Sequence, residues 1–156
     1  MTERIDRLLT LAKEFLGTFL YEHRDLLGDR QGSCLAILDT DGTNEEVHVF
    51  DLGSMPAEKV EEKRGFAKEK VLRLQANPTH STSFESQNVG ASQYGGAIRA
   101  GNNLFVSMSG FPAYLDQEFC IFLCLLDNQM SFAQAQALRD RTRSSYPSSV
   151  QVRLWV

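Results

Sequence analysis

The sequence has few of the residues that usually mark a catalytic or metal-binding site. It contains three histidines, His23, His48 and His80, and three cysteines. No HxxxH, HxH or Cys-x-x-Cys arrangement occurs among them, which argues against the common structural zinc sites and predicts no metal. The phosphate-binding patterns GxGxxG and GxxxxGK[ST] are also absent, as is the nucleophile-elbow pattern GxSxG around Ser109. The motifs therefore predict no catalytic residues, and a binding protein is favoured over an enzyme.

Long apolar runs and concentrated basic charge are missing too. The longest uninterrupted apolar run is residues 119–126, whereas a membrane span needs about twenty residues. The net charge is −4 and no basic face is visible, so we expect neither a membrane nor a nucleic acid as partner. The first residues lack the basic-then-apolar order of a signal peptide, and three cysteines cannot all pair internally. These features predict a cytoplasmic protein.

Length and periodicity predict a single domain, residues 1–156, of the α+β class. Apolar residues at three- and four-residue spacing indicate helices, and short apolar runs around Asp41-Gly42 and around residues 100–103 indicate hairpins. Hairpins separated by helices favour a central antiparallel sheet flanked by helices. The expected helices are residues 4–27, 56–75, 112–126 and 131–143; the expected strands are 34–38, 47–50, 96–99 and 104–108.

The last residues alternate strictly between apolar and polar. Residues 145–149 form a linker-like break, and residues 150–156 follow with valines and a leucine on one face. This pattern predicts that residues 145–156 contain an edge strand or a partner-binding tail. Pairing of such a strand with a partner or with its own copy would give a homo-oligomer.

Residues 77–93 form a polar stretch without a clear period, and loops of this length are usually functional or mobile. His80 lies in this stretch near Phe84. Three alternatives are open for it: a solvated loop histidine, a ligand of haem iron or a general base. The pair Gly95-Gly96 follows. It indicates either a bulge with positive φ at the start of a strand or a place where the backbone approaches a ligand closely. This part of the sequence leaves those alternatives open.

Ser109-Gly110 precedes an apolar helix that Pro112 is expected to begin. We expect the Ser109 hydroxyl to cap the helix or turn, since the catalytic alternative lacks the surrounding glycines. Backbone N–H groups at this helix start could hold a carboxylate, although Asp116 and Glu118 would weaken the binding of an anion.

Several of these segments together resemble the GlcG/HbpS-type family. The similar residues are Ala67-Lys68-Glu69-Lys70, residues 94–101, Ser107-Met108-Ser109-Gly110 and Asp116-Gln117-Glu118. The resemblance covers about residues 60–126, and the chain departs from the pattern in residues 79–93, in the strand 104–108 and at its C-terminus. The resemblance implies a profilin-like fold and an oligomer, and it implies haem or a related tetrapyrrole as a ligand of some members.

The leading hypothesis is a binding module for a small apolar or planar ligand, held where the glycine pair, the Ser109-Gly110 turn and the polar loop meet. The alternatives are an oligomerising interaction protein without a ligand, and a small enzyme in which His80 acts as general base with Asp116 or Glu85. The residues predicted to bind the ligand are His80, Phe84, Tyr94, Gly95, Gly96, Ser109, Gly110 and Phe111.

Overall fold

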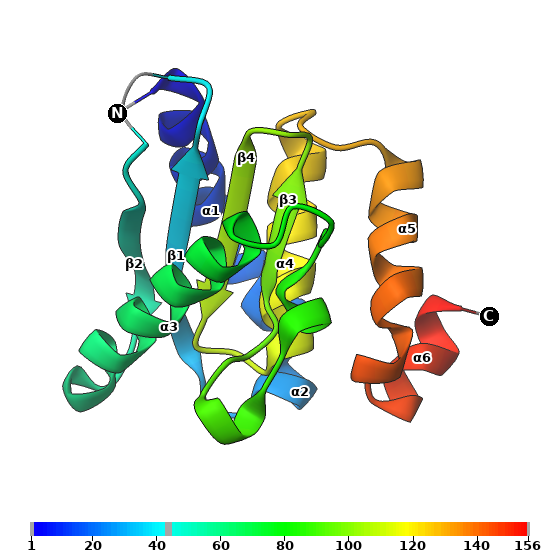
Figure 1. Ribbon diagram of the computed structural model, residues 1–156. Helices are drawn as coiled ribbons and strands as arrows, with labels where there is room; N and C mark the ends of the chain where they lie inside the picture. The colour runs from blue at the N-terminus through cyan, green and yellow to red at the C-terminus, as the bar shows by residue number, and fades with distance from the viewer. Residues whose placement is uncertain (1, 43–44, 156) are drawn as a thin grey trace.

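The computed structural model describes residues 2–42 and 45–155 and contains a four-stranded antiparallel sheet (Figure 1). The strands are β1 (Gln31–Asp39), β2 (His48–Ser54), β3 (Ala97–Ala100) and β4 (Leu104–Ser109), in the order β2-β1-β4-β3. In the two pairings of β1, Leu35 lies opposite Phe50 of β2 and Met108 of β4. The predicted α+β class, with an antiparallel sheet flanked by helices, is confirmed.

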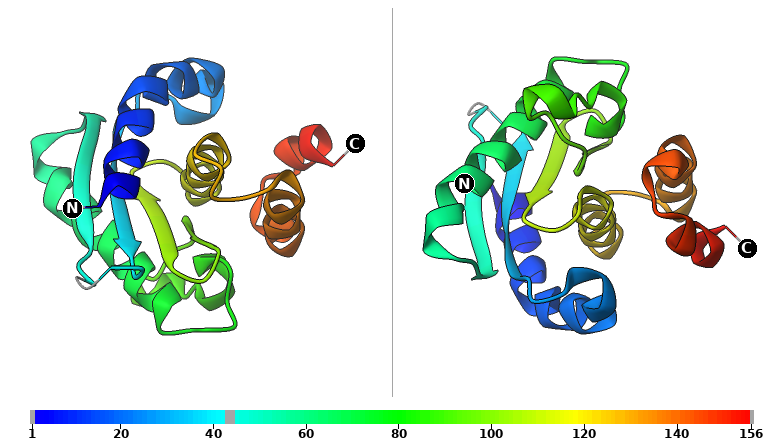
Figure 2. Two further views of the ribbon diagram at one scale, coloured as in Figure 1. Left: turned by 90° about the horizontal axis from the view of Figure 1, so that it is seen from above. Right: turned by 90° about the horizontal axis from the view of Figure 1, so that it is seen from below.

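Helices cover both faces of the sheet (Figures 1 and 2). The helices α1 (Glu3–Glu22) and α4 (Ala113–Leu126) lie on one face, and α3 (Ala57–Gln75) lies on the other. Successive side chains of a strand point to opposite faces, so β1 serves both layers. Leu35 and Ile37 pack toward α1 and α4, whereas Ala36 and Leu38 pack toward α3. Because both faces are covered, β1 is apolar along most of its length.

The N-terminal helix begins and ends close to the predicted positions but is interrupted. Thr2 caps α1 by accepting a hydrogen bond from the Ile5 amide. The regular helix ends at Glu22, and the short helix α2 (Arg24–Leu27) follows after His23. The single helix expected over residues 4–27 is therefore two helices, with His23 between them.

Helix α4 is buried on several sides, as its sequence predicts. It packs on the sheet, and α5 (Phe132–Thr142) lies beyond it. In the described part of the chain, no helix is both long enough and apolar enough to cross a membrane. Cys120 and Cys124 of α4 and Cys34 of β1 are buried free thiols.

The predicted C-terminal strand is wrong. Residues 143–154 form the 3-10 turn η3 (Arg143–Ser145) and the helix α6 (Ser148–Leu154), while Val156 lies outside the described residues. The Pro147 carbonyl accepts the amides of Val150 and Gln151, so it starts a helix locally. Val150 is buried but Val152 is 65% exposed, so the alternating valines do not share one buried face. Packing of Trp155 against Tyr146 favours the helix over a strand at the sheet edge.

The polar stretch before β3 is tied to its neighbours. It contains the 3-10 turns η1 (Ser83–Ser86) and η2 (Val89–Ala91), and Thr82 forms an isolated antiparallel bridge with Ile98. The Arg99 guanidinium donates to the carbonyls of Leu74, Asn77 and His80 at 2.9–3.1 Å. Backbone groups of this stretch therefore serve to join α3 to the edge strand β3.

Candidate functional site

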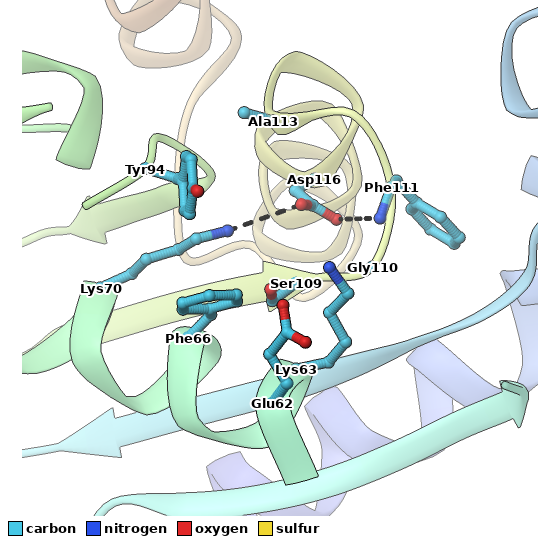
Figure 3. A pocket seen from close by; sticks show the side chains of 10 residues that line it. All are labelled: Glu62, Lys63, Phe66, Lys70, Tyr94, Ser109, Gly110, Phe111, Ala113 and Asp116. Atoms are coloured by element: carbon cyan, nitrogen blue, oxygen red, sulfur yellow. Dashed lines mark hydrogen bonds and ion pairs between the residues drawn. The ribbon is translucent and has the colours of Figure 1, made fainter. Parts of the chain in front are cut away.

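A cavity of about 200 Å³ lies where α3 faces the N-terminus of α4 (Figure 3). Its walls come from α3, from the residue before the glycine pair, from the turn after β4 and from the first turn of α4. The lining residues are Glu62, Lys63, Phe66, Lys70, Tyr94, Ser109, Gly110, Phe111, Ala113 and Asp116.

Lys70 is the unusual member of this set, because it occupies a core position of α3. Ala67, Val71 and Leu74 form the buried stripe of the helix, and Lys70 lies on the same stripe. Its side chain is only 3% exposed. The side chain extends beside the rings of Phe66 and Tyr94 and places its ammonium beside Asp116 (Figure 3).

The Lys70 ammonium and the Asp116 carboxylate form a buried ion pair. Lys70 Nζ lies 3.5 Å from Asp116 Oδ2 and donates a hydrogen bond of 2.7 Å to the Met108 carbonyl. Asp116 Oδ1 accepts a hydrogen bond of 3.1 Å from the Phe111 amide. The pair therefore connects α3, β4 and the turn that leads into α4.

Burial shifts the proton affinity of both groups toward their neutral forms. Desolvation lowers the pKa of Lys70, although Asp116 opposes this shift. Desolvation likewise raises the pKa of Asp116 to about 6, against the opposing effects of Lys70 and of the Phe111 amide. Proton exchange between this amine and this carboxyl is therefore easier than between a lysine and an aspartate in water.

The Asp116 carboxyl predicts a specific dependence of stability on pH. Its pKa is about 6 in the folded protein against an ordinary value of 3.8, so the native state holds the proton between these values. Its stabilising contribution is thus full below pH 3.8 and is lost as the pH rises through 6. The difference corresponds to at most about 3 kcal/mol.

Urea unfolding between pH 4 and pH 7 measures this dependence, with the double variant Lys70→Met/Asp116→Asn as the reference that has neither group. The free energy of unfolding of the wild type is expected to fall with pH relative to this reference. Parallel curves for the two proteins would contradict the assignment.

Two aromatic rings and a second lysine complete the cavity wall. The Phe66 and Tyr94 rings meet edge to face, with centroids 5.3 Å apart. Lys63 Nζ lies 5.5 Å from the centre of the Phe66 ring, and no carboxylate of residues 2–42 or 45–155 lies within ion-pair distance of it. A neighbouring cavity of about 360 Å³ shares Lys63, Gly110 and Phe111 with the first. The Lys63 ammonium thus lies between the two cavities and is free to pair with a ligand.

The acidic residues at the start of α4 do not oppose an anion as strongly as the sequence suggested. Asp116 is turned inward onto Lys70 and the Phe111 amide, and Glu118 pairs with Arg139 at 3.0 Å. Pro112 is the N-cap and offers no side-chain hydrogen bond to the helix. The positive end of α4, with Ala113 at the cavity wall, therefore faces a site in which the Asp116 carboxylate is already paired, although the Glu62 carboxylate of α3 also lines the wall.

The structure brings four of the predicted ligand-binding residues to the cavity wall and places Gly96 beside the ion pair in that wall, whereas His80, Phe84 and Gly95 are not part of the lining. Tyr94, Ser109, Gly110 and Phe111 line the wall. The predicted cap by Ser109 is wrong, because Ser109 ends β4 and Pro112 is the N-cap of α4.

The glycine pair acts by leaving room for neighbouring side chains. Gly96 has φ 118°, and a Cβ there would lie 2.9 Å from both Asp116 Cβ and Lys70 Nζ. A Cβ on Gly95 would overlap the ring of Phe84, which packs against the core and lies outside the cavity. The close approach at Gly96 is therefore to a buried ion pair of the protein itself.

His80 lies apart from the cavity. Its amide donates to the Asn77 carbonyl and its own carbonyl accepts from Arg99. Nδ1 is buried without a hydrogen-bond partner in the part of the chain that the structure describes. Glu85 caps the turn at Ser81 and Thr82, so the structure does not form the predicted pair of His80 with Glu85 or Asp116.

The cavity does not fit the haem that the family resemblance implies. Its volume is below the roughly 300–1,000 Å³ of sites for drug-sized ligands, and a tetrapyrrole needs a site at the upper end of that range. His80, the predicted axial ligand, is absent from its wall. Within the described ranges, no group of three or more His, Cys, Asp or Glu residues could hold a metal ion.

Sequence reasoning missed three of the residues that give the site its chemistry, namely Lys63, Phe66 and Lys70. One signal for Lys70 was present. Residues 67, 70, 71 and 74 have the spacing of a buried helical face, so a lysine at position 70 interrupts an otherwise apolar stripe. A charged residue in such a stripe indicates either a paired buried charge or a functional group. Comparisons of the chain with protein-family models, with curated proteins and with solved structures found no match.

Proposed function

We propose that the protein binds a small organic anion with a planar apolar part in the cavity between α3 and α4. The observation that carries this proposal is that two aromatic rings and the Lys63 ammonium, which has no ion-pair partner among the described residues, surround one hollow of about 200 Å³, while the second lysine is paired with Asp116. The volume favours a molecule of the size of a single ring or a short acid.

Each wall supplies a different contact to such a ligand. The rings of Phe66 and Tyr94 offer apolar surface to a planar group. Lys63, half-buried at the boundary of the two cavities, supplies a charge-assisted hydrogen bond to a carboxylate. The start of α4 adds a favourable field for the same negative charge. Apolar and anionic parts of one ligand are thus accommodated on adjacent walls.

The other two hypotheses from the sequence have less support. An interaction through the alternating C-terminal strand requires a strand, and residues 148–154 are helical. A general base at His80 requires an orienting carboxylate, and among the described residues no carboxylate hydrogen-bonds to it. Homo-oligomer formation stays a prediction, and light scattering of the purified protein measures it.

Benzoate is the first probe, because it has one carboxylate on one planar ring. Calorimetric titration is expected to show saturable binding of benzoate and none of benzyl alcohol, the uncharged molecule of similar shape. Lys63→Gln is expected to weaken benzoate binding about tenfold or more, since it removes a charge-assisted hydrogen bond of about 1.5–3 kcal/mol. The matched control is Lys68→Gln, because Lys68 is exposed on the same helix and does not line the cavity.

Equal binding of benzoate and benzyl alcohol, or equal weakening by the two lysine variants, would contradict the proposal. A parallel titration with hemin tests the ligand that the family resemblance implies. A saturable shift of the Soret band that is lost in His80→Ala would place a haem site elsewhere in the molecule and would displace this proposal.

A further inference from the structure

We infer that Lys70 is a carbonyl-reactive amine, which forms an imine with an aldehyde or ketone group of a ligand held in the cavity. The inference rests on the proposed function, because the cavity must first admit a small organic anion. It adds a chemical class to the ligand: an oxo acid, or an aromatic acid that also bears an aldehyde.

The position of Lys70 distinguishes it from the other lysines of the chain. Lys13, Lys59 and Lys68 are exposed and Lys63 is half-buried, whereas Lys70 is buried with its Nζ at a cavity wall. An amine attacks a carbonyl only in its neutral form, and a buried lysine reaches that form at lower pH than an exposed one. Desolvation does lower the pKa of Lys70.

Asp116 is placed to move the protons that imine formation requires. Its Oδ2 lies 3.5 Å from Lys70 Nζ, and its Oδ1 is held by the Phe111 amide at 3.1 Å. The carboxyl has a pKa of about 6, so both of its protonation states are accessible near neutral pH. No other carboxylate among the described residues forms an ion pair with Lys70.

The reaction balances without an oxidant or a reductant. Asp116 takes a proton from the Lys70 ammonium, and the free electron pair of Nζ forms a bond to the carbonyl carbon. The carbonyl π electrons move to oxygen, and the oxygen and nitrogen exchange a proton to give the carbinolamine. Asp116 then returns its proton to the carbinolamine hydroxyl, which leaves as water as the C=N bond forms. The products are one imine and one water.

The surroundings also suit the product. A protonated imine keeps one N–H and its positive charge, so it can still pair with Asp116 or donate to the Met108 carbonyl. The rings of Phe66 and Tyr94 lie beside the side chain and offer apolar surface near the new bond (Figure 3). The nearby Cys120 thiol does not compete, because burial raises its pKa well above the usual value and keeps it protonated.

The test uses 4-carboxybenzaldehyde, which is benzoate with an added aldehyde. The purified protein is incubated with this probe and sodium cyanoborohydride, which reduces a protonated imine to a stable secondary amine and spares the aldehyde, and the modified lysines are mapped by peptide mass spectrometry. Lys70 is expected to be labelled faster than Lys63 or Lys68, since its burial lowers its pKa and its Nζ lies at the cavity wall. Benzoate in excess is expected to suppress the labelling of Lys70 alone.

Two variants separate a reactive amine from a structural charge. Lys70→Arg keeps the positive charge without a nucleophilic amine, so it is expected to lose the adduct, while Lys68→Arg keeps it. Asp116→Asn is expected to slow the labelling of Lys70 at least about tenfold, and circular dichroism shows whether each variant is folded. The mapping on the wild type decides the question even if a variant fails to fold.

Labelling confined to exposed lysines, with Lys70 unmodified while benzoate still binds in calorimetry, would overturn the imine and leave the proposed function intact. Absence of benzoate binding, with labelling of Lys70 that benzoate does not suppress, would instead overturn the proposed anion site. Labelling of Lys70 at the same rate in Asp116→Asn would overturn the role of Asp116 in proton transfer.

Discussion

Replacing Asp116 by asparagine is expected to lower the free energy of unfolding by about 3–5 kcal/mol, because it leaves the buried Lys70 ammonium without its carboxylate. Asparagine preserves the size of the side chain and can still accept the Phe111 amide. The loss therefore reports the unpaired charge rather than a cavity. Urea unfolding at pH 7.5 measures it.

The double variant Lys70→Met/Asp116→Asn is the informative partner of this experiment. Methionine fills much of the space of the lysine stem and brings no charge, so the double variant is expected to regain at least about 2 kcal/mol over Asp116→Asn. A double variant no more stable than Asp116→Asn would show that the two side chains do not interact. As a control, Asp25→Asn breaks the exposed pair with Arg153 and is expected to cost less than about 1 kcal/mol.

Gly96→Ala is expected to destabilise the protein by about 3–4 kcal/mol, because backbone strain and overpacking each cost about 1–3 kcal/mol and both apply. Gly96 has φ 118°, a conformation that residues with a side chain rarely adopt. The added methyl group would also lie 2.9 Å from Lys70 Nζ and 3.2 Å from the Met108 carbonyl. These are the atoms that hold the ion pair, so binding of benzoate is expected to fall together with stability.

The matched control is Gly65→Ala in the middle of α3. No atom lies within 4 Å of the position that its Cβ would take, so the methyl group meets no obstacle. Alanine there is expected to raise the free energy of unfolding by about 0.5–1 kcal/mol, since glycine is unfavourable inside a helix. Thermal and urea unfolding of both variants give the comparison. A Gly96→Ala protein as stable as the wild type would mean that the glycine pair does not constrain the site.

Much of the fold follows from local patterns in the sequence. The apolar stripe of residues 5–19 predicted α1, and Pro56 marked the start of α3. The two hairpin patterns predicted the four strands. The bounds of these elements agree with the structure within a few residues. Periodicity of this kind depends only on which face of a helix or strand is buried, so it can be recognised without knowing which other element packs against that face. The capping box formed by Ser131 and Gln134 at the start of α5 is equally local.

The C-terminus shows where local patterns fail. Residues 150–155 alternate as a strand does, yet they belong to a helix and its C-cap because Tyr146 and Val150 find a buried place against the rest of the chain. The fate of such a short segment depends on tertiary packing, which outweighs the weak intrinsic preference of valine for a strand. The polar stretch before β3 is similar, since its role became clear only from the arginines that bind its carbonyls.

Some residues of the candidate site could likewise be predicted from the sequence, and others could not. Tyr94, Gly96, Ser109, Gly110 and Phe111 could be singled out from the sequence because glycines and turns mark places where backbone approaches something closely. The meeting of Lys70 with Asp116 could not, since these residues are 46 positions apart and sit on helices that cover opposite faces of the sheet. By itself the sequence determined the class of fold, most of the helices and strands before residue 143 and the absence of familiar motifs, because each depends on neighbours along the chain. Only the tertiary structure decided that a lysine of α3 faces a carboxylate of α4 at a cavity wall, because burial and distance between remote side chains arise only when the layers pack together.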